Sequence, residues 1–176
     1  AIAASAVQAV VEPQSTSIGG DCFCLYSQAG SDRIIAMNGS GRAPKRLSAE
    51  WLLQQGIAKI EQQSPHSVTV PTAVDAWTQL NRDYGNTPLG ELLQPAIGYA
   101  CDGFPIGQRV ANDFADCHDL LAGDADIASV YMKNGKDFEY GDLCRNPNLA
   151  KTLNAIAEHG RDGFYKGWVA DDILNK

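Results

Sequence analysis

The sequence predicts an α+β fold in which helices predominate. Apolar residues recur at helical spacing in most segments of the 176-residue chain, as at Leu149, Leu153 and Ile156. Two short stretches combine strand-forming residues with turn residues, and no internal repeat or low-complexity tract interrupts the pattern. With 44% apolar residues, the composition is that of a globular domain.

The chain is expected to open with a helix and continue into a hairpin. Residues 1–11 are small and apolar on every side, which predicts a fully buried helix. A proline and paired glycines in 12–20 then mark a loop. Strand formers at 22–27 and 33–37 flank turn residues at 28–32, so a β-hairpin follows the loop.

A glycine-rich loop and three helices are expected next. The stretch 38–44 contains two glycines and a proline, which predict a bent loop. Helical periodicity follows at 49–62, 73–84 and 88–101. Thr87 directly before Pro88 predicts a capping hydroxyl with proline at the first helical position.

The last third of the chain is also predicted to be mainly helical. Asn134-Gly135 is the strongest short hairpin signal in the sequence, which predicts strands at 129–132 and 138–140. Further helices are predicted at 108–121, 148–158 and 168–174. Apolar helical patterns at both ends of the chain begin or stop without capping residues. We therefore expect residues 1–176 to be a single-domain fragment that is incomplete at both ends.

Composition and charge exclude several classes of function. The net charge is −7 and the sequence pI is about 4.8, which disfavours binding to nucleic acid or to an anionic membrane surface. No apolar run approaches the ~20 residues that a membrane-spanning helix needs. We expect neither nucleic acid nor membrane as a partner.

The cysteines and histidines predict no metal site and no disulfide scaffold. Five cysteines are an odd number, and we interpret them as mostly reduced and buried. Cys22 and Cys24 lack a second pair at zinc spacing, and the three histidines are isolated from one another. We expect no metal and no cofactor. Reduced thiols favour a cytoplasmic location, with a periplasmic or secreted protein as the open alternative.

Arg42 is the residue whose surroundings favour ligand binding. It follows Gly39-Ser40-Gly41 at the end of a predicted strand, where the glycines would let a ligand approach the backbone. A guanidinium can form paired hydrogen bonds with a carboxylate. The alternative is structural: the arginine would pin its loop to an acidic neighbour.

The order of short motifs along the whole chain resembles the γ-glutamyltranspeptidases and their relatives. The similar segments are Ala1-Ile2-Ala3-Ala4, Val11-Glu12-Pro13, Ile18-Gly19-Gly20, Gly41-Arg42-Ala43-Pro44, Val68-Thr69-Val70-Pro71, Tyr84-Gly85, Thr87-Pro88-Leu89, Leu93-Gln94-Pro95-Ala96-Ile97, Ala100-Cys101-Asp102-Gly103-Phe104, Gly141-Asp142, Asn148-Leu149-Ala150-Lys151-Thr152-Leu153, Ile156-Ala157 and Gly163-Phe164-Tyr165-Lys166-Gly167.

This resemblance implies an N-terminal-nucleophile hydrolase. Its fold is a four-layer αββα sandwich, of which this chain would be the early part of the large subunit. A proenzyme of the family cleaves itself, and a threonine that then opens the small subunit is the nucleophile. The resemblance therefore implies no catalytic residue in this chain, a small subunit from the same precursor as partner, and a small-molecule amide as substrate. Alone, residues 1–176 would be inactive.

The resemblance also implies a substrate-binding position. In the family, an arginine in the motif R-E-x-A-P binds the α-carboxylate of the γ-glutamyl group. Aligned on Ala43-Pro44, that arginine falls on Ser40, whereas Arg42 stands two residues later. We expect Ser40 and Arg42 to contact substrate. The form of the segment from Gly39 to Pro44 resembles the acylase and amidohydrolase branch of the family more than the glutathione enzymes. The alternatives are a γ-glutamyl enzyme, an acylase or amidohydrolase acting on a glutaryl- or oxamate-like amide, and a degenerate relative without catalysis.

Overall fold

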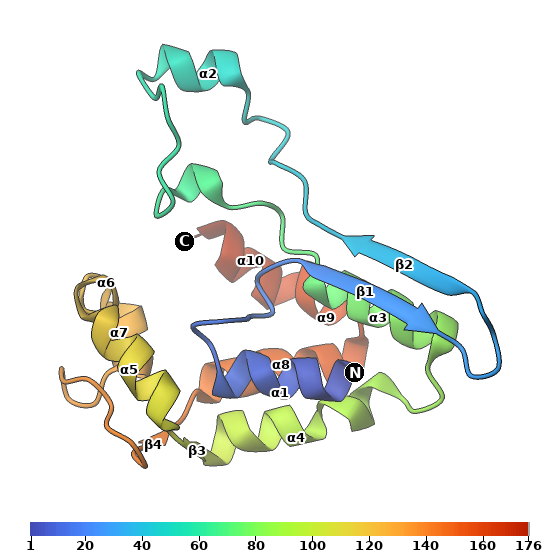
Figure 1. Cartoon of the computed structure of the whole chain (residues 1–176). Coiled ribbons are helices and arrows are strands. Elements are labelled where there is room, and N and C mark those ends of the chain that lie inside the picture. Colours follow the sequence, from blue (N-terminus) through green and yellow to red (C-terminus); the bar gives the residue numbers. More distant parts are fainter. Residues whose placement is uncertain (176) are drawn as a thin grey trace. The chain divides into compact units, whose positions relative to one another are not determined.

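The computed structural model describes residues 1–175, and the chain forms two compact units. One unit consists of Ala1–Ser17 together with the chain from Leu80 onward, and the other is Ile18–Gln79. Each unit combines helices with one short antiparallel strand pair. The predicted helix-rich α+β class is therefore confirmed (Figure 1).

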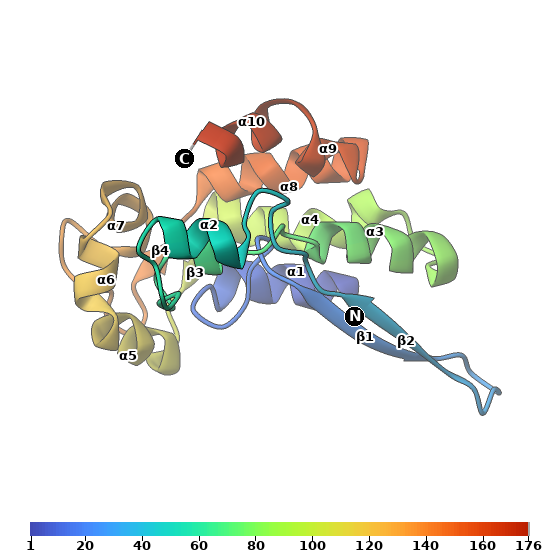
Figure 2. The same ribbon diagram turned by 90° about the horizontal axis from the view of Figure 1, so that it is seen from above.

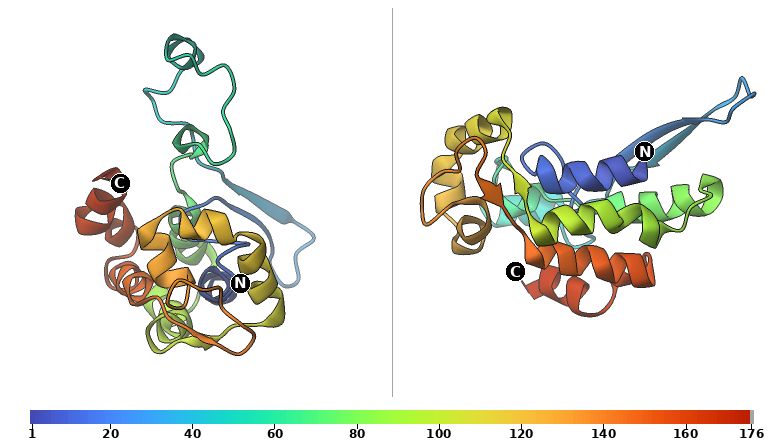
Figure 3. Two further views of the ribbon diagram at one scale, coloured as in Figure 1. Left: turned by 90° about the vertical axis from the view of Figure 1, so that its left-hand side faces the viewer. Right: turned by 90° about the horizontal axis from the view of Figure 1, so that it is seen from below.

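Three helices form the core of the larger unit. α4 (Leu89–Asp102) packs against both α1 (Ile2–Val11) and α8 (Pro147–His159), and the three lie side by side in Figures 1 and 3. Small side chains let helix axes approach closely, so the alanine-rich sequence of α1 suits this packing. The side chains buried on these helices include Ala6, Val10, Leu93, Ala96, Ala100, Leu153 and Ile156.

Short elements complete the larger unit. They are β3 (Phe104–Pro105), α5 (Gln108–Asp116), α6 (His118–Ala122), α7 (Ala125–Tyr131), β4 (Leu143–Cys144), α9 (Asp162–Tyr165) and α10 (Gly167–Asn175). α9 packs on α8, and α10 on α9 (Figure 2). In the α5–α7 group, the Phe114 ring lies 5.7 Å from Tyr131 and 6.4 Å from Phe138, between centroids. These aromatic contacts supply this group with a small core of its own.

The smaller unit is built around a two-stranded antiparallel ribbon. β1 (Cys22–Ser27) pairs with β2 (Ile34–Gly39), with Cys22 opposite Gly39. The unit also contains α2 (Ala49–Gln54), the 3₁₀ turn η1 (Pro65–Ser67) and the N-terminal part of α3 (Ala73–Tyr84). One face of the ribbon is half-buried, whereas Phe23, Leu25 and Ile34 on the other face are 69%, 76% and 67% exposed.

Most of the predicted elements are confirmed. The helix predicted at 73–84 is α3, and those predicted at 1–11, 88–101, 148–158 and 168–174 correspond to α1, α4, α8 and α10 within one to two residues. The first hairpin is confirmed as well, although β2 begins and ends later than predicted. The Thr87 cap is wrong, because Pro88 itself is the N-cap residue of α4 and no side chain caps that helix.

Two helices are shorter than predicted. The helix expected at 49–62 ends at Gln54, because Gly56 takes a φ of 77°, which reverses the chain direction as a glycine after a helix commonly does. The helix expected at 108–121 breaks at Cys117, where φ is −105° and ψ is 14°, and resumes as α6. Neither break changes the apolar periodicity, so the pattern alone predicted continuous helices.

The predicted second hairpin is wrong, although its turn is real. Asn134 and Gly135 both have positive φ, at 55° and 75°, as a tight two-residue turn requires. The turn is bracketed by a single bridge between Lys133 and Lys136 rather than by two strands. The segment before it is α7, because the Asp124 carboxylate accepts hydrogen bonds from the first backbone N–H groups of that helix.

Burial is less complete than the sequence suggested. Only one face of α1 is buried, with Ile2, Ala6, Ala9 and Val10, because α4 covers one side of it. Among the five free cysteines, Cys144 alone is buried, Cys22 and Cys24 are half-buried, and the other two are exposed. In the part of the chain that the structure describes, no helix is long and apolar enough to cross a bilayer.

Candidate functional site

The two predicted substrate-binding residues lie on the loop that leaves β2. Ser40 and Arg42 flank Gly41 directly after the strand ends at Gly39, and both side chains are exposed. The segment belongs entirely to the smaller unit. What it can bind depends on how firmly its backbone is fixed and on which side chains remain unpaired.

Asp21 holds the near end of this loop. Its carboxylate accepts a hydrogen bond from the backbone N–H of Gly41 at 2.8 Å and another from the Ser40 hydroxyl at 3.3 Å. The Asn38 side chain accepts a third bond, from the Ser40 N–H at 3.0 Å. Hydrogen bonds to a charged acceptor are the stronger kind, so Asp21 sets the direction in which the chain leaves β2.

The segment before α3 holds the far end of the loop. The Val70 N–H donates to the Arg42 carbonyl at 3.0 Å, and the Thr72 hydroxyl donates to the Gly39 carbonyl at 2.5 Å. The N–H groups of Thr72 and Ala73 both donate to the Gly20 carbonyl, at 3.1 and 3.0 Å. The backbone is thus bonded on both sides of Arg42, which gives this residue a defined starting point.

Gly41 is required for this close approach. A Cβ at position 41 would lie 1.9 Å from the Val70 carbonyl oxygen and 3.0 Å from the Thr69 hydroxyl oxygen. Gly39 is similarly confined, since a Cβ there would lie 2.5 Å from the Cys22 carbonyl oxygen. These glycines serve backbone packing rather than the approach of a ligand to the backbone, which the sequence analysis had expected.

The Arg42 guanidinium has no partner within residues 1–175. No carboxylate of the described chain forms an ion pair with it, so the alternative in which it pins the loop to an acidic neighbour finds no support. Its N–H donors are available to a ligand, and the planar fork suits a carboxylate. The Ser40 hydroxyl, in contrast, donates its hydrogen to Asp21 and can only accept a hydrogen bond from a ligand.

Asp21 is the site residue that the sequence analysis missed. It stands alone after Gly19-Gly20 and belongs to no motif, so nothing in its immediate neighbourhood points to a role. Only the hairpin register seen in the structure brings it to the site. Because Cys22 faces Gly39, one further step along the two strands brings Asp21 opposite Ser40.

The other candidate reactive groups do not form a catalytic site in the described part of the chain. Burial raises the pKa of the Cys22 thiol, with a smaller contribution from Cys24, and burial raises that of Cys144 to about 11. Raised pKa values make thiols poor nucleophiles. His118 pairs with Asp137 through Nδ1 at 2.8 Å rather than with the adjacent cysteine. No group of three metal-ligating side chains occurs between residues 1 and 175.

Comparison with known proteins identifies relatives for the whole chain. The family model described as "Gamma-glutamyltranspeptidase" matches residues 1–176. The glutathione hydrolase-like YwrD proenzyme of Bacillus subtilis (strain 168) is 35% identical over 176 residues, which are 99% of this chain and 33% of that protein.

Solved structures are similar over the same length. The γ-glutamyltranspeptidase of Helicobacter pylori matches with a TM-score of 0.92 at 30% identity, over 99% of this chain and 51% of that one. The cephalosporin acylase of Bacillus halodurans matches with a TM-score of 0.91 at 34% identity, over 98% and 33%. The expected N-terminal-nucleophile hydrolase fold is therefore confirmed. The chain spans about a third of the length of the curated relatives it matches.

Proposed function

Because the chain belongs to the gamma-glutamyltranspeptidase family, we propose that the protein is an amide hydrolase or acyl transferase with an N-terminal threonine nucleophile outside residues 1–176. The threonine attacks the amide carbonyl and releases the amine, and water or a second amine then takes up the acyl group. The observation that supports this proposal is the match in family and fold over the whole chain.

Arg42 and Ser40 are proposed to contact the acyl group of the substrate. The free Arg42 guanidinium provides a partner for a carboxylate, and the bonded backbone on either side keeps it in one place. Ser40, at the position of the family's arginine, cannot make a bidentate contact with an α-carboxylate. This favours an acylase or amidohydrolase acting on a glutaryl- or oxamate-like amide over an enzyme that prefers γ-glutamyl groups.

The proposed partner is a small subunit cut from the same precursor, which carries the threonine. The relatives from Bacillus subtilis and Escherichia coli are themselves proenzymes. The exposed apolar side chains of Phe23, Leu25 and Ile34 support the proposal, because a contiguous apolar strand face is typical of a surface that another chain covers.

The test uses the complete gene product. Denaturing electrophoresis and intact mass should resolve two chains, and the processed protein should hydrolyse glutaryl-p-nitroanilide faster than γ-glutamyl-p-nitroanilide. Arg42→Ala should lower kcat/KM roughly 10-fold or more while processing continues, since a hydrogen bond to a charged group is worth ~1.5–3 kcal/mol. Arg33→Ala, directly before the start of β2, is the matched control and should have no such effect.

A degenerate, non-catalytic relative is the second candidate. The free Arg42 would then bind a carboxylate ligand without turnover. A complete protein that stays as one chain, lacks the threonine and hydrolyses no amide would establish this alternative and exclude the enzyme.

We also propose a cytoplasmic location, with a periplasmic or secreted protein as the alternative. The five free thiols support it, because reducing compartments keep cysteines unpaired. Alkylation of the thiols in fractionated cells tests this proposal. Full alkylation of the protein in the cytoplasmic fraction would support it, whereas thiols protected by a disulfide would favour an oxidising compartment.

A further inference from the structure

A groove lies in the smaller unit, between the turn before α2 and the 3₁₀ turn η1. It encloses about 630 Å³ and is open on one side. Apolar and aromatic side chains provide most of its lining, with one arginine and one histidine. The lining residues are Pro44, Arg46, Leu47, Trp51, Pro65 and His66. None of them has a role in the function proposed above.

Local hydrogen bonds fix the two aromatic walls of this groove. The Ser48 hydroxyl accepts a bond from the Trp51 N–H at 3.1 Å, which caps α2 and orients its first turn. The Ser64 hydroxyl accepts one from the His66 N–H at 3.2 Å. The indole and imidazole rings meet edge to face, with centroids 5.5 Å apart. The two rings therefore lie against each other in the groove, and Trp51 is 40% exposed at its surface.

The one arginine that lines the groove, Arg46, has no ionic partner in the described chain. Arg42 and Lys45 precede it within five positions of the chain, and none of the three forms an ion pair with any described residue. Residues 18–79 carry five basic and five acidic side chains, so this unit is formally neutral although the whole chain has a charge of −7. A cationic run left unpaired in an acidic chain is available for an anionic ligand.

No acidic side chain of residues 18–79 forms an ion pair with Arg46. Glu61 pairs with Lys59 at 3.0 Å, and Asp21 accepts hydrogen bonds from the loop after β2. The carboxylate of Glu50 is held at the first turn of α2, where the backbone and then Ser48 lower its pKa by hydrogen bonding. Arg46 is thus free to contact an anion beside the Trp51 ring.

We propose that this groove is a substrate subsite for an aromatic group that carries a carboxylate. Trp51 provides a stacking surface, Pro44 and Pro65 provide rigid apolar walls, and Arg46 binds the carboxylate. The inference rests on the proposed function: the groove binds the outer part of an amide substrate whose acyl group is held at Arg42. The substrate class becomes aryl-substituted acidic amides rather than small dicarboxylic amides alone.

Direct binding tests the groove independently of catalysis. Isothermal titration calorimetry measures binding of 3-phenylpropionate to the processed full-length protein. Two control probes are titrated in the same way: 3-phenylpropionamide, which lacks the charge, and hexanoate, which lacks the ring. We expect a Kd of about 1 mM for the aromatic acid, which is typical for a fragment of this size, and much weaker binding of the other two.

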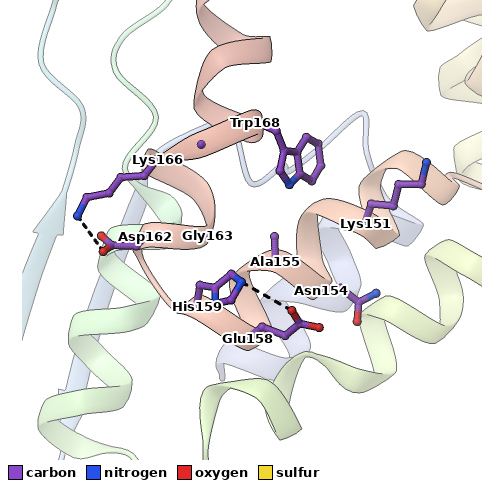
Figure 4. Close-up of a pocket in the computed structure, with 10 residues that line it drawn as sticks. Lys151, Asn154, Ala155, Glu158, His159, Asp162, Gly163, Lys166 and Trp168 are labelled. Carbon is purple, nitrogen blue, oxygen red and sulfur yellow. Dashed lines mark hydrogen bonds and ion pairs between the residues drawn. The ribbon is translucent and has the colours of Figure 1, made fainter.

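Paired variants separate a built site from general charge attraction. Arg46→Gln should weaken binding about fivefold, whereas Lys45→Gln removes the same charge next door and should change little. Trp51→Leu should weaken binding ~3- to 10-fold, and Trp51→Phe should restore much of the loss. Trp168 is an exposed tryptophan that lines a different pocket, in the larger unit (Figure 4), so Trp168→Leu should have no effect.

The outcomes are distinguishable from failure of the proposed function. Absence of saturable binding, or equal losses in Lys45→Gln and Arg46→Gln, overturns the subsite even if the protein hydrolyses amides. Retained binding in a protein without amidase activity overturns the proposed function and leaves the groove as a carboxylate site. In an active enzyme, Arg46→Gln should raise KM for an aryl-acid amide with kcat unchanged, and it should leave glutaryl-p-nitroanilide unaffected.

Discussion

Gly41→Ala should damage the substrate-binding loop, although it adds only one methyl group. The new Cβ would lie 1.9 Å from the Val70 carbonyl oxygen, which is backbone and cannot rotate away. The two segments must separate by more than 1 Å to restore van der Waals contact, which requires roughly 3.2 Å or more between carbon and oxygen. Separation stretches the 3.0 Å hydrogen bond from the Val70 N–H to the Arg42 carbonyl.

The expected cost is about 2–4 kcal/mol. Overpacking contributes ~1–3 kcal/mol, and a weakened backbone hydrogen bond contributes ~1 kcal/mol. At ~2–4 °C per kcal/mol for a domain of this size, Tm should fall by several degrees. Because the movement displaces the backbone of Arg42, kcat/KM for the preferred carboxylate-bearing substrate should fall together with stability.

Gly98→Ala is the matched control. Gly98 lies inside α4, and a Cβ there meets nothing within 4 Å. Alanine in a helix is better than glycine by ~0.5–1 kcal/mol, so this variant should be slightly more stable. The two variants are compared by their Tm in thermal melts and by amide hydrogen exchange at residues 39–42 and 69–73. Unchanged exchange in Gly41→Ala, or an equal effect of the two substitutions, would refute the reasoning.

Three further predictions concern single side chains. Asp21→Ala should lower the free energy of unfolding by only about 1 kcal/mol, because the hydrogen bonds that Asp21 accepts from the loop are solvent-exposed. It should also lower affinity for the substrate carboxylate. Urea unfolding measures the first effect and KM the second. The hydrogen bond that His118 donates to the Asp137 carboxylate raises the pKa of His118. The pair therefore stabilises the fold below the ordinary pKa of ~6.5 and ceases to do so as pH rises through the raised value; in Asp137→Asn, NMR titration should find His118 back near its ordinary pKa. Cys144, buried and with its pKa raised to about 11, should be alkylated much more slowly than exposed Cys117 in the native protein, and equally fast in urea.

Helices with strong apolar periodicity could be predicted from the sequence, whereas their ends depended on single residues. α3 has the predicted bounds because Asp75 and Arg82 lie in its first and last turns and no glycine interrupts it. α2 has the same kind of pattern, but Gly56 ends it eight residues early. At Cys117 no glycine or proline marks the break, so no local signal could have predicted it.

Local turn chemistry predicted the conformation at Asn134-Gly135 but not what the turn connects. Two positive φ angles are a property of the dipeptide itself. Whether strands flank it depends on the neighbours, and the Asp124 cap commits the preceding segment to α7. The sequence did contain this signal, because an aspartate three residues before Ile127 is a typical helix N-cap.

The geometry of the candidate site could not be predicted because it depends on strand register. Strands starting at Cys22 and Arg33 would place Ser27 opposite Arg33, whereas the structure places it opposite Ile34. Both faces of β1 are apolar, with Cys22 and Cys24 inside and Phe23 and Leu25 outside, so the pattern fits either register equally well. A slip of one residue would move Asp21 away from Ser40 and the Gly41 N–H. The bonds that Asp21 accepts from Ser40 and Gly41 therefore depend on the register set in the turn at 28–33, whereas the bond from the Val70 N–H fixes Arg42 from the segment before α3.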